Sequence, residues 1–445
     1  MEKPGKSRIK ALEMLNNAGF EAYLVGGSVR DIVMGKAPGD TDITTNALPR
    51  QTEKVFRNFK VVKTGLKHGT VTVFIDGEPA EITTYRTEGK YTDLRHPDNV
   101  TFTRNLNLDL QRRDFTVNAL CMDKNGDIVD LHGGMADIDK RIIRCVGDPE
   151  KRFAEDPLRI LRAVRFRSTL GFEIEENTRR AAENKAYLIE KISRERVYSE
   201  FKKAVVGAYF PTVLEQYRNI LDVCLPGVLA MKGFDQKNQH HIYDVLTHTS
   251  KVIENVPPVY PLKAAALFHD IGKPKTFTVD ENGTGHFYGH NKASARITNE
   301  ILTKLKAPGE EKNLISRLVL YHDTAIEPTE KGVRRALNKH GETVLRMLLR
   351  LKRRDNLGQN YRVYNHSRYY DEIEQLIDRQ IAKEACFSLR QLAVNGRNLQ
   401  EIGVKPSPFT GKILNTLLQK VIDGELPNDK QSLLEFAKTM IKQKE

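Results

Sequence analysis

The sequence predicts an α+β protein, in which a small head of mixed β-sheet and helices precedes a long all-α body. Short runs of alternating apolar and polar residues, typical of strands, fall within the first 147 residues. After Gly147 the apolar residues recur with helical spacing instead. Strands followed by a long run of helices are typical of α+β proteins and of separate domains.

The head elements follow from these patterns in chain order. Apolar runs bounded by glycine and polar residues predict its strands, and period-3.6 runs predict its helices. The polar stretch over residues 86–101 has neither period and predicts a mobile loop. The other expected elements are a helix over 7–18, a strand over 21–25, a helix from Ser28, strands over 40–44, 70–75 and 80–85, a helix after Asp114 and a strand over 127–131.

The body is predicted to be helical throughout. Its middle part, residues 243–360, is rich in histidine, and a C-terminal unit over 388–444 follows a charged helix. The helices predicted individually are 158–166, 177–190, 196–206, 211–221 and 369–383.

The chain carries 71 Lys and Arg against 58 Asp and Glu, a formal net charge of +13. This balance favours a polyanionic partner, most often nucleic acid, although a basic protein without one is an open alternative. Four scattered cysteines indicate neither a disulfide framework nor a zinc site. No apolar run approaches the ~18 residues that span a bilayer, and the first ten residues are polar. We therefore expect a cytoplasmic protein without membrane contact.

A glycine turn in the head is a candidate phosphate site. Gly26 and Gly27 separate an expected strand from an expected helix, and Arg30 follows in that helix. Glycines there allow backbone amides to approach a phosphate, and Arg30 would add a bidentate contact. Because such turns are also common as plain connections, the motif alone is weak.

Two carboxylates ten residues further on strengthen the hypothesis. Asp40 and Asp42 are two residues apart, so in a strand both face the same side. Like charges this close are unfavourable, and hard divalent cations with oxygen ligands relieve the repulsion. Two Mg²⁺ ions would activate an attacking hydroxyl and stabilise a departing pyrophosphate. Glu81 on a later strand would add a third carboxylate; a solvated acidic turn and a strand-end salt bridge are the alternatives.

A second motif opens the helical body. Asp156, Arg159, Arg162 and Arg165 recur every three residues and therefore form one slowly drifting helix face. Ile160, Leu161 and Val164 can pack on the other side of this helix. Asp156 before Pro157 is also a good helix start, and the arginines could be a solvated stripe. Three arginines with no acid among them repel one another, which favours a face that meets a triphosphate or an RNA backbone.

Together these motifs resemble bacterial class II tRNA nucleotidyltransferases, the CCA-adding enzymes of the polymerase-beta-like superfamily. The resemblance rests on the glycine turn with Val29-Arg30-Asp31, the Asp40/Asp42 pair, residues 112–120 and residues 155–166, in family order. Residues 194–203 resemble a later neck motif and residues 389–438 the tail module of the family.

The resemblance implies a polymerase-beta-like head that adds nucleotides to the tRNA 3′ end from CTP and ATP, with Asp40, Asp42 and Glu81 as catalytic residues. It makes Asp156 and Arg159 a protein template that pairs with the edge of the incoming base, whereas GTP and UTP leave polar groups mispaired. It also gives the 86–101 loop a role in switching from C to A addition. The other implied nucleotide-binding residues are Gly26, Gly27, Arg30, Arg113, Arg162 and Arg165.

The histidine-rich part resembles the HD phosphohydrolase superfamily. His269-Asp270, with His248 before it and Asp355 after it, matches the basic four-ligand metal set, and His290 and His322 match the extra pair of two-metal members. Imidazole ligands suit Mn²⁺, Fe²⁺, Ni²⁺ or Co²⁺ better than Mg²⁺. The implied activity is phosphatase or 2′,3′-cyclic phosphodiesterase action; a degenerate fold with structural histidines is the alternative.

The resulting organisation is a nucleotidyltransferase head (1–147), a helical neck and body (148–240), an HD domain (241–365) and a tail (366–445). The expected partners are CTP, ATP and the acceptor arm and 3′ end of tRNA, held by shape and phosphate contacts, without an obligate protein partner. An A-adding enzyme, a poly(A) polymerase, and a phosphohydrolase with a nucleotide-binding head are the alternatives.

Overall fold

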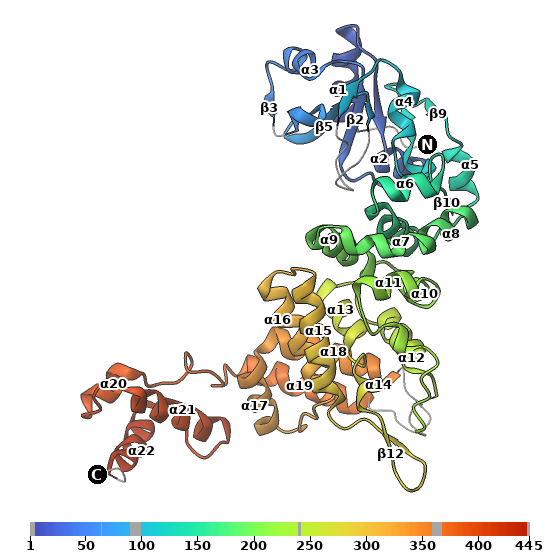
Figure 1. Cartoon of the computed structure of the whole chain (residues 1–445). Coiled ribbons are helices and arrows are strands. Elements are labelled where there is room, and N and C mark those ends of the chain that lie inside the picture. The colour runs from blue at the N-terminus through green and yellow to red at the C-terminus, as the bar shows by residue number, and fades with distance from the viewer. Residues whose placement is uncertain (1–4, 64, 90–98, 239–241, 358–366, 443–445) are drawn as a thin grey trace. The chain divides into compact units, whose positions relative to one another are not determined.

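The structure is a computed structural model that describes the chain except residues 1–4, 64, 90–98, 239–241, 358–366 and 443–445 (Figure 1). It forms two compact units. One comprises residues 1–229 with 304–306, and the other residues 230–303 with 307–445. No helix of the described residues is long and apolar enough to cross a membrane. The finer division into four domains stays a prediction.

A seven-stranded mixed sheet forms the centre of the head. The sequence predicted a mixed sheet and five of its strands, but not those over 60–62 and 120–122. The order of the sheet is β3-β4-β5-β2-β1-β8-β9, and β2 and β5 are its parallel pair. Val71, Val73 and Ile75 alternate along β4 and are buried, which is why that strand was recognisable in the sequence. The strands are β1 (Ala22–Val25), β2 (Thr41–Thr45), β3 (Lys60–Val62), β4 (Thr70–Ile75), β5 (Glu78–Thr84), β8 (Leu120–Met122) and β9 (Ile128–Asp130).

Helices α1 (Lys6–Asn17) and α3 (Pro49–Val55) pack on this sheet. Helix α1 buries Ala11, Leu12 and Leu15 against it, which is the apolar stripe expected of a surface helix. The remaining helices and turns of the head are α2 (Gly27–Val33), η1 (Leu66–His68), α4 (Leu106–Gln111), η2 (Thr116–Asn118), α5 (Gly134–Asp139) and α6 (Pro149–Glu155).

Two predictions for the head were wrong. The helix expected after Asp114 is only the single 3₁₀ turn η2, because the apolar residues that follow it pair with β1 as strand β8 instead. The ends of the predicted 86–101 loop are strands β6 (Arg86–Glu88) and β7 (Val100–Phe102), which form an antiparallel pair. Most of that loop, residues 90–98, lies outside the described residues.

The neck helices pack through α7 (Leu158–Leu170) and α9 (Arg194–Val205). Ile160, Leu161 and Val164 are buried, as the three-residue spacing of the arginines predicted for the other side of α7. The predicted helices over 177–190 and 211–221 are each divided in two. The other neck elements are β10 (Ile142–Ile143), β11 (Glu173–Ile174), α8 (Glu176–Asn184), η3 (Ala186–Lys191), α10 (Phe210–Gln216) and α11 (Arg218–Cys224).

In the described part of the second unit, the only strands are the short hairpin β12–β13, and the other elements are helices. Its C-terminal helices have their own apolar core around Leu399, Leu417 and Leu433. Its elements are η4 (Leu229–Met231), α12 (Val245–Asn255), α13 (Tyr260–Phe268), α14 (Lys273–Thr276), β12 (Thr278–Val279), β13 (Gly285–His286), α15 (His290–Lys304), α16 (Gly309–Tyr321), α17 (Glu330–His340), α18 (Glu342–Leu357), α19 (Ser367–Ala382), α20 (Gly396–Glu401), α21 (Pro408–Ile422) and α22 (Lys430–Lys442).

Candidate functional site

Asp42 and Glu81 are direct neighbours across the parallel pair of the head sheet. They are register partners between β2 and β5, so both side chains leave the same face. Asp40 lies one residue before β2, not inside it, because the strand begins at Thr41. All three carboxylates line one open pocket of about 400 Å³.

The environment of Asp42 is strongly negative. Burial raises the pKa of Asp42 above its ordinary value, the guanidinium of Arg113 opposes this, and the carboxylates of Glu81 and Asp40 add to it. Clustered carboxylate oxygens of this kind fit a hard divalent cation. Among the described residues, however, the three head carboxylates are not one of the groups whose ligand atoms all lie within 4.8 Å of one another.

The absence of a side chain at Gly26 leaves room for Arg113 beside Asp42. The Gly26 φ of +82° is a left-handed conformation that favours glycine. A β-carbon at Gly26 would lie 3.3 Å from an Arg113 terminal nitrogen and 3.9 Å from Asp42 Oδ2, so a side chain there would crowd both. Arg113 Nε is buried and finds no hydrogen-bond partner among the described residues. A buried guanidinium donor beside the carboxylates is suited to an anionic ligand such as a phosphate.

Arg30 has intramolecular partners. Its guanidinium donates to Asn118 Oδ1 at 2.7 Å and to Asp31 Oδ1 at 2.8 Å, and it lies over the Phe166 ring. With only 7% of its surface exposed, it ties helix α2 to the turn η2. The phosphate contact predicted for Arg30, and the backbone contacts predicted for Gly27, stay predictions.

Arg159 lies in the first turn of α7, whereas Asp156 lies in extended backbone between α6 and α7 and so is not on the helix face predicted for it. Each of the two side chains is held by other residues. Asp156 Oδ2 accepts a hydrogen bond from Arg196 at 2.8 Å, and its Oδ1 accepts one from the backbone N–H of Leu158 at 3.1 Å. Arg159 donates to Glu155 Oε2 at 2.9 Å and to the carbonyl of Arg112 at 3.2 Å. Arg196, on α9, was not recognised in the sequence, because its contact spans 40 residues.

The argument that the neck arginines lack acidic partners was wrong. Arg162 pairs with Asp114 at 2.5 Å and Arg165 with Glu200 at 2.5 Å. Burial alone would raise the pKa of Asp114, yet Arg162 and hydrogen bonds lower it to about 2. The acids come from other segments, so the spacing along α7 could not reveal them. Breaking such a partly buried pair from one side costs about 3–5 kcal/mol, so these arginines also stabilise the fold.

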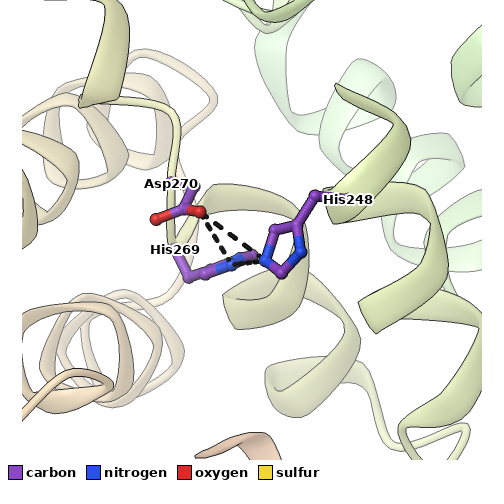
Figure 2. A group of neighbouring side chains, drawn as sticks. All are labelled: His248, His269 and Asp270. Atoms are coloured by element: carbon purple, nitrogen blue, oxygen red, sulfur yellow. Dashed lines mark hydrogen bonds and ion pairs between the residues drawn. The ribbon is translucent and has the colours of Figure 1, made fainter. Parts of the chain in front are cut away.

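The histidines and aspartates of the second unit form two overlapping groups of potential metal ligands. His248, His269 and Asp270 form one, and Asp270, His290 and His322 form the other, with all ligand atoms of each group within 4.8 Å. Figure 2 shows the first group. The Nε2 atoms of His248 and His269 lie 3.2 Å apart, and Asp270 Oδ2 lies 3.3 Å from His269 Nε2. Asp270 therefore belongs to both groups.

Asp355 and the second group complete the arrangement. Asp355 Oδ1 lies 2.9 Å from His248 Nε2 and 3.6 Å from His269 Nε2. The Nε2 atoms of His290 and His322 lie 3.3 Å apart. The structure thus brings together all six residues that the sequence predicted, from helices α12, α15, α16 and α18 and the end of α13.

Local hydrogen bonds orient three of these rings. In each, Nδ1 lies 2.7–2.9 Å from the carbonyl oxygen three residues earlier, which directs Nε2 into the cluster. The pairs are His269 with Ala266, His290 with Phe287 and His322 with Val319. Burial and the nearby His269 lower the pKa of His322 to about 3. Burial also lowers the pKa of His269, but Asp270 and Asp355 outweigh it and raise that pKa to about 10. Both donor types and ring orientations fit a two-metal centre.

Two buried lysines support this centre, and the ligand pattern alone did not indicate them. Lys273 Nζ lies 2.7 Å from Asp270 Oδ2 and donates to Gln236 at 2.9 Å. Lys352 Nζ donates to the carbonyl of His322 at 2.6 Å and so fixes the end of α16. Lys273 follows Asp270 by only three residues, whereas the contact of Lys352 spans 30 residues.

Three family models match the chain. The model described as "Poly A polymerase head domain" matches residues 22–144, and "Probable RNA and SrmB- binding site of polymerase A" matches 171–231. The model "tRNA nucleotidyltransferase domain 2 putative" matches 289–437. None of the three descriptions names an HD phosphohydrolase.

Full-length relatives agree with these matches. The CCA-adding enzyme of Ligilactobacillus salivarius is 33% identical over 440 residues, which cover 99% of this chain and 97% of the relative. That of Pediococcus pentosaceus is 35% identical over 95% of each chain. The crystal structure of the Bacillus stearothermophilus CCA-adding enzyme in complex with CTP matches with a TM-score of 0.74 and 28% identity, over 100% of both chains.

The shared carboxylate predicts unequal effects of ligand substitutions on metal content. We expect the chain, loaded with Mn²⁺ and desalted, to retain about two equivalents by elemental analysis, one for each ligand group. Because Asp270 serves both groups, Asp270→Ala should lose both metals, whereas His290→Ala should lose one.

His340→Ala is the matched control, since His340 belongs to neither group. Equal metal content in Asp270→Ala and the unsubstituted chain would contradict the shared-ligand arrangement.

Proposed function

The chain belongs to the class II CCA-adding tRNA nucleotidyltransferases, and we propose that Asp40, Asp42 and Glu81 form the catalytic metal site of its head. As a CCA-adding enzyme it extends the 3′ end of tRNA with C, C and A. Full-length relatives carry this name, so we do not adopt the A-only, poly(A) or purely hydrolytic alternatives. The observation that supports the proposed site best is the register pairing of Asp42 with Glu81 beside Arg113.

The proposed reaction is a phosphoryl substitution. The 3′-hydroxyl of the tRNA loses its proton and its oxygen bonds to the α-phosphorus of CTP or ATP, while the bond from that phosphorus to the β-phosphate oxygen breaks and pyrophosphate leaves. Mg²⁺ ions, when bound by the three carboxylates, activate the attacking hydroxyl and offset the charge of the leaving group. Arg113, whose guanidinium lies near Asp42, would hold the triphosphate, because its buried Nε has no hydrogen-bond partner among the described residues.

Base selection is assigned to the start of α7. Arg159 donates to the acceptors of the base edge, and the Asp156 carboxylate accepts from its amino group. Arg196 holds Asp156 and Glu155 holds Arg159, so both groups are positioned before a nucleotide arrives. Arg162 and Arg165 steady the sugar and phosphates while Asp114 and Glu200 hold their guanidinium groups in place. The acceptor arm of tRNA is proposed to bind to basic helices of the body and tail. The enzyme is proposed to act in the cytoplasm, where tRNA matures.

The first prediction concerns the carboxylates. Asp42→Ala should lower both C and A addition by at least about 10³-fold. Without this carboxylate, the metal ion that would neutralise the negative charge of the transition state is no longer held. The measurement is extension of tRNA lacking its CCA end, with CTP and ATP separately and together, alongside tRNA binding, which should stay near normal.

Asp76→Asn is the control, since Asp76 is an exposed acid in the turn between β4 and β5 and pairs with the surface residue Lys10. Retained addition of either nucleotide by Asp42→Ala would refute the assignment.

The second prediction concerns the protein template. Asp156→Ala or Arg159→Ala should reduce the preference for CTP and ATP over UTP and GTP by about tenfold or more, since a mispaired buried group costs about 1–3 kcal/mol. Arg196→Ala should have a smaller effect in the same direction, because it loosens Asp156 without removing it. The measurement is kcat/KM for each of the four nucleotides.

Arg180→Ala, an exposed arginine on α8, should leave the preference unchanged. A template variant that is slower but equally selective would mean that these residues are structural.

We also propose that the histidine–aspartate cluster hydrolyses phosphoesters. Its support is the two-group ligand arrangement around Asp270, which fits transition metals by ligand type. Such metals supply a hydroxide nucleophile at neutral pH. In the hydrolysis of a 2′,3′-cyclic phosphate, a water oxygen bonds to phosphorus, one ribose–oxygen bond to phosphorus breaks, and the freed ribose oxygen takes a proton. The product is a phosphomonoester.

The two sites should be chemically independent. The double variant His269→Ala, Asp270→Ala should lose cyclic phosphodiesterase and phosphatase activity while CCA addition stays within about twofold, because its ligands belong to a different compact unit from Asp42. A lower unfolding temperature is expected, since a bound metal stabilises the folded state by mass action. The measurement is both assays on one purified protein, with folding checked by circular dichroism.

If addition falls in parallel with hydrolysis in a folded protein, the sites are coupled and the proposal is wrong. If the unsubstituted chain binds metal but hydrolyses no phosphoester, the cluster is structural.

A further inference from the structure

A solvent-exposed aromatic ring lies at the rim of the histidine–aspartate cluster. A cavity of about 320 Å³ is lined both by the ligands Asp270, His290 and His322 and by His286 and Tyr288. Tyr288 is 79% exposed, the highest value among the exposed large hydrophobic side chains that the structure describes. It precedes the ligand His290 by two residues, so its backbone position is tied to the metal centre.

The ring is supported from one side. His286 stacks on Tyr288 with their planes 7° apart and their centroids 5.3 Å apart. His286 Nε2 in turn lies 2.8 Å from Asp280 Oδ2. The other oxygen of Asp280 accepts the backbone N–H groups of Asn282 and Thr284 at 2.9 Å each, which closes the turn of the β12–β13 hairpin. One face of the tyrosine ring is thus covered by a fixed neighbour, and the opposite face is left to solvent.

The hairpin itself (β12 in Figure 1) is anchored at its base. The backbone N–H of Gly285 donates to the carbonyl of Lys237 at 2.8 Å. Phe277 packs edge-on against Phe234 at 5.1 Å and contacts Phe287 at 5.4 Å. These contacts pack the phenylalanines at the base of the hairpin without Tyr288, so the exposed ring is not needed to hold the hairpin to the unit.

An exposed, supported aromatic ring beside a metal centre is suited to one class of ligand. Every nucleobase has a flat π-face that stacks on tyrosine, whatever its hydrogen-bonding pattern. A phosphate held at the metal centre and a base stacked on the rim are joined through a ribose in a nucleoside phosphoester. A simple phosphate ester without a base would gain nothing from the ring.

We propose that Tyr288, supported by His286 and Asp280, is a stacking platform for the nucleobase of a nucleoside phosphoester whose phosphate binds at the histidine–aspartate cluster. The inference rests on the proposed hydrolytic function and gives that site its substrate class. The ester is either a free mononucleotide or the terminal nucleotide of an RNA, because both present the same phosphate, ribose and base.

A single fluorophore can test the platform directly. The chain has no tryptophan, so Tyr288→Trp keeps a stacking ring and makes it the only indole. With the Mn²⁺-loaded full chain, adenosine 2′-monophosphate should quench this fluorescence with saturation, whereas ribose 5-phosphate should not.

Val279→Trp is the matched control, because it places the indole on the same hairpin but outside the residues that line the cavity. Its fluorescence should not respond to the nucleotide. Absence of quenching in Tyr288→Trp, or equal quenching by ribose 5-phosphate, would overturn the inference whether or not the site hydrolyses anything.

Kinetics separate this inference from the proposed hydrolysis. Tyr288→Ala should raise KM for a nucleoside 2′,3′-cyclic phosphate about tenfold, with kcat and metal content unchanged, and should not affect hydrolysis of glycerol phosphate. Tyr288→Phe should behave like the unsubstituted chain, since stacking needs no hydroxyl. A short RNA ending in a cyclic phosphate, assayed in parallel, identifies which source of the terminal nucleotide binds more tightly.

Hydrolysis of both esters with a KM that Tyr288→Ala leaves unchanged would overturn the platform and leave the hydrolytic function standing. Hydrolysis of neither ester by the unsubstituted chain would overturn the hydrolytic function, and the fluorescence titration would then decide the platform alone.

Discussion

The head depends on the register of the parallel pair β2 and β5. Side chains of a strand alternate between the two faces, so a shift of one residue would move Glu81 to the opposite face from Asp42 and separate the two carboxylates. The register is fixed by burial of the apolar neighbours, because Ile43 pairs with Ile82 in the core while Asp42 pairs with Glu81 beside it. The same alternation that forms the core therefore concentrates the negative charge.

The sequence allowed the elements with strong local periods to be predicted. Strand β4, with its alternating valines, was placed at its observed bounds, and the buried side of α7 was recognised from helical spacing. Elements that form only through pairing with distant segments could not be predicted from local periodicity. The segment after Asp114 has apolar residues that could suit a helix, but pairing with β1 makes it a strand, and Arg86 becomes part of β6 only because Phe102 pairs with it.

The candidate sites divide in the same way. The clustering of the six histidines and aspartates could be predicted, since their residue types and order in the chain match a known ligand pattern. Their supports, Lys273 and Lys352, act through a buried ion pair and a distant backbone carbonyl, and nothing in the local pattern marks Lys352. The acidic partners of Arg162 and Arg165 are 48 and 35 residues away, so an arginine stripe that looked unpaired in sequence is neutralised in three dimensions.

These arginine–carboxylate pairs have a consequence for conformational entropy. A long side chain such as arginine loses up to about 2 kcal/mol of rotamer freedom when it is fixed. Arg162 and Arg165 lose much of that freedom when the protein folds, because Asp114 and Glu200 already select their rotamers. A ligand that contacts these two arginines therefore binds to guanidinium groups that are already ordered. The entropy cost of fixing their side chains falls on folding and does not weaken binding.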